Sequence, residues 1–212
     1  MKLTINASLR AIQLACHGDP KYEAMQHVLV VPPERRHGLT PLDPFVETGC
    51  VMATNGTIAV VRQLEPGQFD GNVPALVRFE GKKGKPDDEW VVILPERGMP
   101  VAVNGTKGST LTVHRSRLDR SDFPNVVAAM GALPGPKDWG MIHGEDNKLA
   151  LDPFHLHDLI MSMGLVRLST EDRKYNRDHG VVFYSGGYLM PVWVRIDGCV
   201  DVYGVVMPRR ID

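Results

Sequence analysis

The sequence has no excess of charge of either sign. Its 24 Lys and Arg residues stand against 25 Asp and Glu residues, for a formal net charge of −1. A protein that binds duplex DNA through a broad basic face is usually strongly cationic, so the composition excludes that simple mode of binding. Any contact with DNA must therefore depend on local charge or on topology.

Long hydrophobic runs and paired cysteines are also lacking. No segment approaches the roughly 18 consecutive apolar residues of a membrane span, and residues 1–6 lack the apolar run of a signal peptide. The cysteines, Cys16, Cys50 and Cys199, are three in number and have no paired spacing, which indicates reduced thiols. We therefore expect a cytoplasmic protein that does not contact a membrane.

The sequence offers no catalytic constellation. His155 and His157 lie two residues apart on an expected helix, so they point to different faces and cannot share a metal ion. Residues 105–110 lack the Gly-Lys-Ser/Thr order of a phosphate-binding loop, and no Gly-x-Ser-x-Gly elbow occurs. We expect no enzymatic activity, no metal and no cofactor.

Turn residues are plentiful, with 21 glycines and 16 prolines that divide the chain into short elements. In the first part, residues 7–17 have the amphipathic pattern of a helix that ends at Gly18. Asn55 and Gly56 predict a hairpin turn between two strand-like runs. The strands expected here are residues 3–5, 28–31, 46–52 and 58–61.

The last part of the chain predicts the same order of elements. Asp152 is a natural N-cap and Pro153 suits the first helical position, so we expect a helix that runs to about Met163 and stops at Gly164. Strands are expected at residues 166–168, 181–184, 189–196 and 202–207.

The middle of the chain differs from both ends. Residues 95–108 contain too many Gly, Pro and Asn residues for a long helix, and the strands expected nearby are residues 76–79, 90–94 and 111–114. We predict an α+β fold of repeated strand-helix-strand-strand-strand half-modules with antiparallel sheets. Residues 1–132 would hold two half-modules, the second poorly helical, and residues 133–212 a C-terminal half-domain.

Short motifs in consistent order resemble those of bacterial DNA polymerase III beta subunits, the sliding clamps. They are the hairpin at residues 53–59, Phe123-Pro124-Asn125, the helix start at residues 151–156, Pro191-Val192-Trp193 and Val205-Val206-Met207-Pro208. The resemblance implies a DNA-clamp-like fold. There are departures: the hairpin is one residue shorter and has Thr57 in place of a His-Arg pair, and Arg209 replaces a Met. Full clamps of this family have three domains of two half-modules each, whereas this chain has room for about three half-modules, so it looks like a shortened clamp of phage or prophage type. A closed ring would need twelve half-modules, which four copies of a three-module chain or three of a four-module chain would supply.

The resemblance also implies a hydrophobic pocket that binds a short Leu- and Phe-containing peptide of a DNA polymerase or another clamp-binding protein. Arg209 would either weaken the binding of an apolar peptide or select an acidic one. Carried over by position, the pocket residues are Thr54, Gly56, Ile58, Val205, Val206, Met207 and Pro208.

A clamp holds double-stranded DNA topologically and touches its phosphates non-specifically. The candidates for such contacts are Arg10, Lys21, Lys82, Lys83, Arg115, Arg117 and Arg120, although each also fits an ordinary solvated charge. The leading interpretation is a homo-oligomeric replication or repair factor. One alternative is a monomeric clamp homologue that competes for clamp-binding peptides or blocks a host or defence protein. A small-molecule enzyme on an unrelated α+β fold is the other, and it would need a deep polar pocket.

Overall fold

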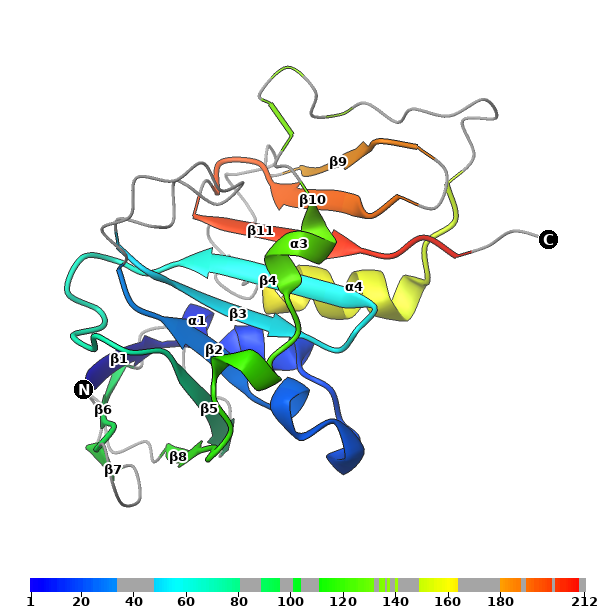
Figure 1. The fold of residues 1–212 in the computed structure, drawn as a ribbon. Coiled ribbons are helices and arrows are strands. Elements are labelled where there is room, and N and C mark those ends of the chain that lie inside the picture. The colour runs from blue at the N-terminus through cyan, green and yellow to red at the C-terminus, as the bar shows by residue number, and fades with distance from the viewer. Residues whose placement is uncertain are drawn as a thin grey trace.

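A computed structural model describes residues 1–33, 48–80, 89–95, 101–103, 111–131, 134–135, 137, 140, 149–163, 180–187, 190–199 and 201–209 (Figure 1). Its α-helices and 3₁₀ helices are α1 (Ala7–Ala11), η1 (Ile12–Ala15), η2 (Pro20–Gln26), η3 (Arg120–Asp122), α3 (Val126–Met130) and α4 (Pro153–Ser162). Its strands are β1 (Lys2–Asn6), β2 (Val28–Val31), β3 (Cys50–Thr54), β4 (Ile58–Gln63), β5 (Ala75–Glu80), β6 (Glu89–Ile93), β7 (Val101–Val103), β8 (Thr112–Arg115), β9 (Val181–Ser185), β10 (Val192–Ile196) and β11 (Val202–Val206).

The described strands form two antiparallel sheets. The larger has eight strands in the order β8-β5-β2-β3-β4-β11-β10-β9, and the smaller has the order β1-β6-β7. In the larger sheet, β4 from the first part of the chain pairs with β11 from the last part. One continuous sheet thus joins residues on both sides of the predicted boundary at residues 132 and 133.

The larger sheet has two covered faces. Because side chains alternate along a strand, Val60 and Val206 point to the face covered by α1, η1 and α4, whereas Val61 and Val205 point to the opposite, outer face. Phe123, Val126 and Met130 cover part of that outer face. Figure 1 shows α3 in front of the sheet and α4 behind it.

The two helices that the sequence predicts, α1 and α4, begin where expected. The side chain of Asn6 accepts a hydrogen bond from the backbone of Leu9 and caps α1, and Asp152 caps α4 through the backbone N–H groups of Phe154 and His155. Pro153 follows as the first helical residue. The first helix becomes a 3₁₀ helix after Ala11, a change that the amphipathic pattern does not reveal.

The packing of α4 on the sheet requires a residue without a side chain. A Cβ atom placed on Gly204 of β11 would lie 2.7 Å from Leu159 Cδ1 and 2.9 Å from Met163 Sδ. Both distances are shorter than real Cβ contacts allow, so Gly204 is what lets the helix approach the strand.

Most of the expected elements that fall on described residues are confirmed. The helix that starts after Asp152, the hairpin at Asn55-Gly56 and the strands of both ends are present within a few residues of their predicted limits. The 3₁₀ helices η2 and η3, the short helix α3 and the short strand β7 were not predicted from the sequence. The strand expected at residues 166–168 lies outside the described residues, as do residues 46 and 47.

Candidate functional site

The hairpin and the last strand meet at one end of the large sheet. Ile58 is the register partner of Val206, and the backbone N–H of Met207 donates a hydrogen bond of 2.9 Å to the carbonyl of Thr57. The hairpin and the end of β11, about 150 positions apart in the sequence, therefore lie side by side, as the resemblance implied.

Side-chain hydrogen bonds hold the hairpin turn. Thr54 Oγ1 donates to the carbonyl of Ile58 at 2.7 Å and accepts from the N–H of Gly56 at 3.0 Å. The side-chain oxygen of Asn55 accepts from the N–H groups of Thr57 and Ile58, both at 2.9 Å. Gly56 has φ of 89°, which a residue with a side chain rarely adopts. The turn is thus held in one conformation by its own side chains.

Only part of the predicted pocket reaches the surface. Met207 is 41% exposed, Gly56 is exposed and Pro208 is half-buried, so these three can contact a ligand directly. Thr54 and Val205 are buried, and by strand alternation they lie on the outer face below that rim.

Ile58 and Val206 occupy a different position from the one predicted. They are 1% and 0% exposed and belong to the core on the helix face. Alternation along each strand directs them inward, because their neighbours Ala59 and Val205 point outward. Ile58 and Val206 therefore lie in the core beneath the predicted pocket and are not exposed for direct contact with a peptide.

The segment that covers the outer face adds residues that the sequence analysis missed. Phe123, Val126 and Met130 are 6%, 3% and 3% exposed and share one apolar cluster with Val205 and Trp193. The apolar run that follows Phe123-Pro124-Asn125 was the available signal. A groove between this segment and the sheet has Leu29 and Met52 among its lining residues, together with Val73 and Pro74.

The residues after β11 contact the start of α4. The backbone N–H of Arg209 donates to the carbonyl of Ala150 at 2.8 Å, and Arg209 Nη1 lies 3.4 Å from Asp152 Oδ2. Asp152 therefore both caps α4 and pairs with Arg209, the residue that replaces a Met of the clamp pattern.

The candidate DNA contacts do not gather on one face. Arg10 lies on α1 with its guanidinium 5.5 Å from the centroid of the Trp90 ring, whereas Arg120 lines the groove on the outer face. Lys21 lies on η2, Arg115 at the end of β8 and Arg117 just after it, while Lys82 and Lys83 lie outside the described residues.

The helices α1, η1 and α4, which cover the face of the large sheet opposite to the outer face, carry little positive charge. Arg10 is the one Lys or Arg residue in α1, η1 and α4, as their sequences show. A basic helix layer, which the resemblance would place against DNA, is thus not present in these three helices.

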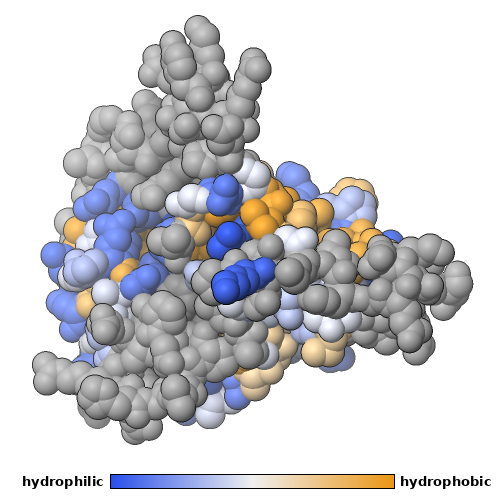
Figure 2. Space-filling view, turned by 90° about the horizontal axis from the view of Figure 1, so that it is seen from above, coloured by the Kyte–Doolittle hydropathy of each residue, from blue (hydrophilic) through white to orange (hydrophobic). Residues whose placement is uncertain are grey.

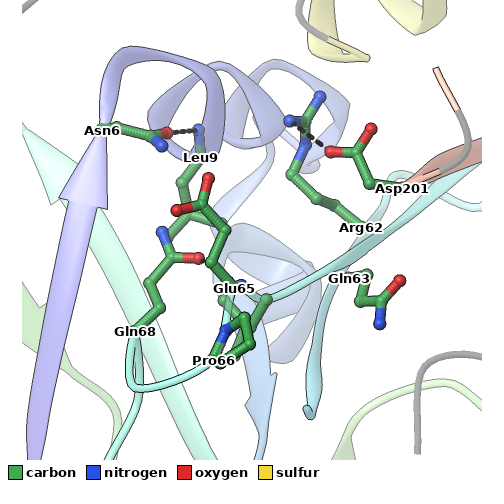
Figure 3. A pocket seen from close by; sticks show the side chains of 9 residues that line it. Asn6, Leu9, Arg62, Gln63, Glu65, Pro66, Gln68 and Asp201 are labelled. Carbon is green, nitrogen blue, oxygen red and sulfur yellow. Dashed lines mark hydrogen bonds and ion pairs between the residues drawn. The ribbon is translucent and has the colours of Figure 1, made fainter. Parts of the chain in front are cut away.

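A polar pocket of about 240 Å³ lies beside the start of α1 (Figure 3). Arg62, 7% exposed, points into this region and pairs with Asp201 at 3.2 Å, and its Nη2 donates to the carbonyl of Met163 at 2.6 Å. Arg62 therefore joins β4 both to the end of α4 and to the turn before β11. Its role in the fold is a link between the two ends of the chain.

The described residues show no cluster of three or more His, Cys, Asp or Glu side chains that could hold a metal ion. Within the same residues, no helix has the length and apolar character needed to span a membrane. All three cysteines are described and none forms a disulfide. Burial raises the pKa of the Cys16 thiol to about 12, although the charge of Arg78 opposes this shift.

Comparison with solved structures places the fold. A putative DNA polymerase III beta subunit from Eubacterium rectale covers all of this chain with a TM-score of 0.56 and 9% identity. A sliding clamp from Bartonella birtlesii, bound to griselimycin, covers 99% with a TM-score of 0.56 and 12% identity. The beta subunit from Borrelia burgdorferi, in complex with a natural product, covers all of it with a TM-score of 0.58 and 7% identity.

The chain spans only 65% to 66% of the length of these three proteins. No protein-family model matches the sequence, and neither does any curated protein. The structural likeness, with antiparallel sheets and a few short helices, shows that the chain has a clamp-like α+β fold.

Proposed function

We propose that this chain is a non-catalytic, sliding-clamp-like accessory factor of DNA replication or repair. It would act in the cytoplasm and tether a polymerase or another DNA enzyme through a shallow apolar site. The proposal depends on the junction of the hairpin and the last strand. There the backbone N–H of Met207 donates a hydrogen bond to the carbonyl of Thr57, and Met207 remains 41% exposed.

The junction suits the capture of a short peptide. Met207 has a flexible, polarizable side chain that adapts to different apolar anchors, and the fixed hairpin reduces the entropy lost on binding. Gly56 and Pro208 add surface without large side chains, and Thr54 and Val205 lie beneath them. A peptide with Leu and Phe anchors is the ligand class that fits.

A substitution at Met207 tests the site. Met207→Glu places a charge where an apolar anchor would lie, and we expect at least a tenfold loss of affinity for a Leu- and Phe-containing peptide in fluorescence polarisation. Ile93→Glu is the matched control, because Ile93 is 40% exposed on the separate small sheet. Equal affinity of wild type and Met207→Glu would remove the peptide site from the proposal.

The state of assembly separates two candidate functions. In chain order we count three half-modules, namely β1 to β4 with α1, β5 to β8, and α4 with β9 to β11. By the count of twelve half-modules in a ring, four copies would close one. Light scattering at several concentrations should then give a homo-oligomer, and salt-sensitive association with duplex DNA should accompany it.

The second candidate is a monomeric interaction protein that competes for clamp-binding peptides or blocks a host or defence protein. The scarcity of Lys and Arg on α1, η1 and α4 favours it, because a clamp needs to tolerate DNA against its helices. A stable monomer that binds the peptide but does not bind DNA at low salt would favour this function over that of a sliding clamp.

A further inference from the structure

Arg209 is a fixed cation at the rim of the proposed peptide site. Its backbone N–H is bonded to the carbonyl of Ala150 at 2.8 Å, and its guanidinium Nη1 lies 3.4 Å from Asp152 Oδ2. The side chain is nevertheless 66% exposed. A long side chain that is held at both ends and open to solvent can engage a ligand with a smaller loss of entropy than a freely moving one.

Asp152 is well suited to hold this cation. One carboxylate oxygen accepts hydrogen bonds from the N–H groups of Phe154 at 2.9 Å and His155 at 3.4 Å, while the other faces Arg209. Partial desolvation acts to raise the pKa of Asp152, but these N–H groups and the charges of His155 and Arg209 outweigh it and hold the pKa below its ordinary value. Asp152 therefore stays ionised and paired at neutral pH.

The pair leaves positive charge facing solvent. A guanidinium has five N–H donors, and Asp152 takes one at Nη1. The N-terminus of α4, which starts at Pro153, contributes further partial positive charge and offsets part of the Asp152 charge. The exposed side of Arg209 is thus complementary to a carboxylate.

Exposed apolar residues lie close in sequence to both members of this pair. Met207 precedes Arg209 by two residues and is 41% exposed, and Phe154, two residues after Asp152, is 79% exposed. A ligand that covers Met207 and continues along the chain toward Asp152 would therefore pass the guanidinium of Arg209.

We propose that Arg209 makes the peptide site selective for a partner segment that carries a carboxylate beside its apolar anchors. The inference rests on the proposed peptide site and identifies the class of its partner: an acidic, apolar linear segment of a DNA enzyme. Of the two effects that the sequence left open for Arg209, the fixed and exposed guanidinium favours selection of an acidic partner.

Three peptides that differ at one position test this inference. They share the same Leu and Phe anchors and carry Asp, Asn or Lys at the neighbouring position. At low salt we expect the Asp peptide to bind wild type roughly two- to fivefold more tightly than the Asn peptide, the range of an exposed ion pair. The Lys peptide should bind least tightly, and added salt should reduce both differences.

Variants of Arg209 give the matched controls. Arg209→Gln should bind the Asp and Asn peptides equally, and Arg209→Glu should reverse the order and prefer the Lys peptide. Because the Arg209 side chain is largely exposed, the melting temperatures of these variants should stay close to that of wild type.

The outcomes distinguish the two proposals. If wild type binds the three peptides with equal affinity, the role of Arg209 is wrong and the peptide site stands. If the preference for Asp persists in Arg209→Gln, another group selects the carboxylate and the inference is overturned. If wild type binds none of the peptides, the peptide site and the inference fall together.

Discussion

The helices near the two ends of the chain pack on the same face of the large sheet but are held there differently. The N-terminal helix is a short α1 followed by the 3₁₀ helix η1, and it is anchored by its own buried side chains Leu9, Ile12 and Ala15. The C-terminal helix α4 is a continuous ten-residue helix whose position depends on a glycine in β11 and an arginine in β4. The position of α4 thus depends on residues outside the helix, and one of them, Arg62, lies in the first part of the chain.

Removing Arg62, which links β4 to the end of α4, should have the largest effect on stability. In Arg62→Met the carbonyl of Met163 and the carboxylate of Asp201 lose a buried charged partner, so we expect the free energy of unfolding to fall by about 2–3 kcal/mol. Urea denaturation measures this change. Asp201→Asn is the control and should cost less than about 1 kcal/mol, because the Asp201 side chain is 45% exposed. Equal costs for the two variants would show that the contact with Met163 contributes little.

Filling the contact between α4 and the sheet comes next. Gly204→Ala adds a methyl group against Leu159 and Met163, and overpacking of this kind costs about 1–3 kcal/mol. We expect a lower melting temperature in a thermal scan. Gly180→Ala is a matched control, since a Cβ atom at Gly180 has no neighbour within 4 Å and should leave the melting temperature nearly unchanged. An unchanged melting temperature for Gly204→Ala would mean that α4 moves away without loss.

The caps of the two helices allow the most direct comparison. Asp152→Ala should cost about 1 kcal/mol through loss of the cap, and it also removes the exposed pair with Arg209. Asn6→Ala should cost about the same or less, because α1 is only five residues long and its single cap bond goes to Leu9. Chemical denaturation of both variants checks the order. A larger loss of stability in Asn6→Ala than in Asp152→Ala would show that α1 depends more on its cap than α4 does.

A thiol at the end of the N-terminal helix gives the smallest effect. Because burial raises the pKa of Cys16 to about 12, its thiolate is scarce at pH 8.5, and we expect slow alkylation of native protein. Unfolding in urea should restore ordinary reactivity, and mass spectrometry of the alkylated peptides measures both rates. Stability is linked to the same shift: between pH 9 and 12 the unfolded state loses this proton first, so raising the pH should destabilise wild type more than Cys16→Ala. Rapid alkylation of native Cys16 would contradict the raised pKa of its thiol.

Much of the fold is predictable from local patterns. The strands β2 and β5 and the helix α4 follow from β-branched runs, Pro and Gly stops and the Asp152-Pro153 start, which are all properties of a few neighbouring residues. The conversion of a helix to η1 after Ala11 and the short strand β7 are not visible in such patterns. For β7, pairing with β6 and not local preference decides the structure.

The candidate site was predictable in position but not in detail. The motifs at the hairpin and at Met207-Pro208 correctly indicated that these segments meet. Sequence order did not reveal that Val206 faces the helices, that Met130 covers part of the outer face, or that Arg209 pairs with Asp152. The first depends on the register of β4 against β11, since a shift of one residue would exchange the two faces. The other two depend on where distant segments of the chain pack.

The amino-acid order alone set where the chain turns, where α4 begins and which short runs form strands, because these choices depend on backbone dihedrals and capping groups within a few residues. Which side chains are exposed, which charges pair and which helices lie beside which strands required the assembled molecule. Contacts such as Arg62 with Met163 join residues 101 positions apart, and no local preference encodes that approach.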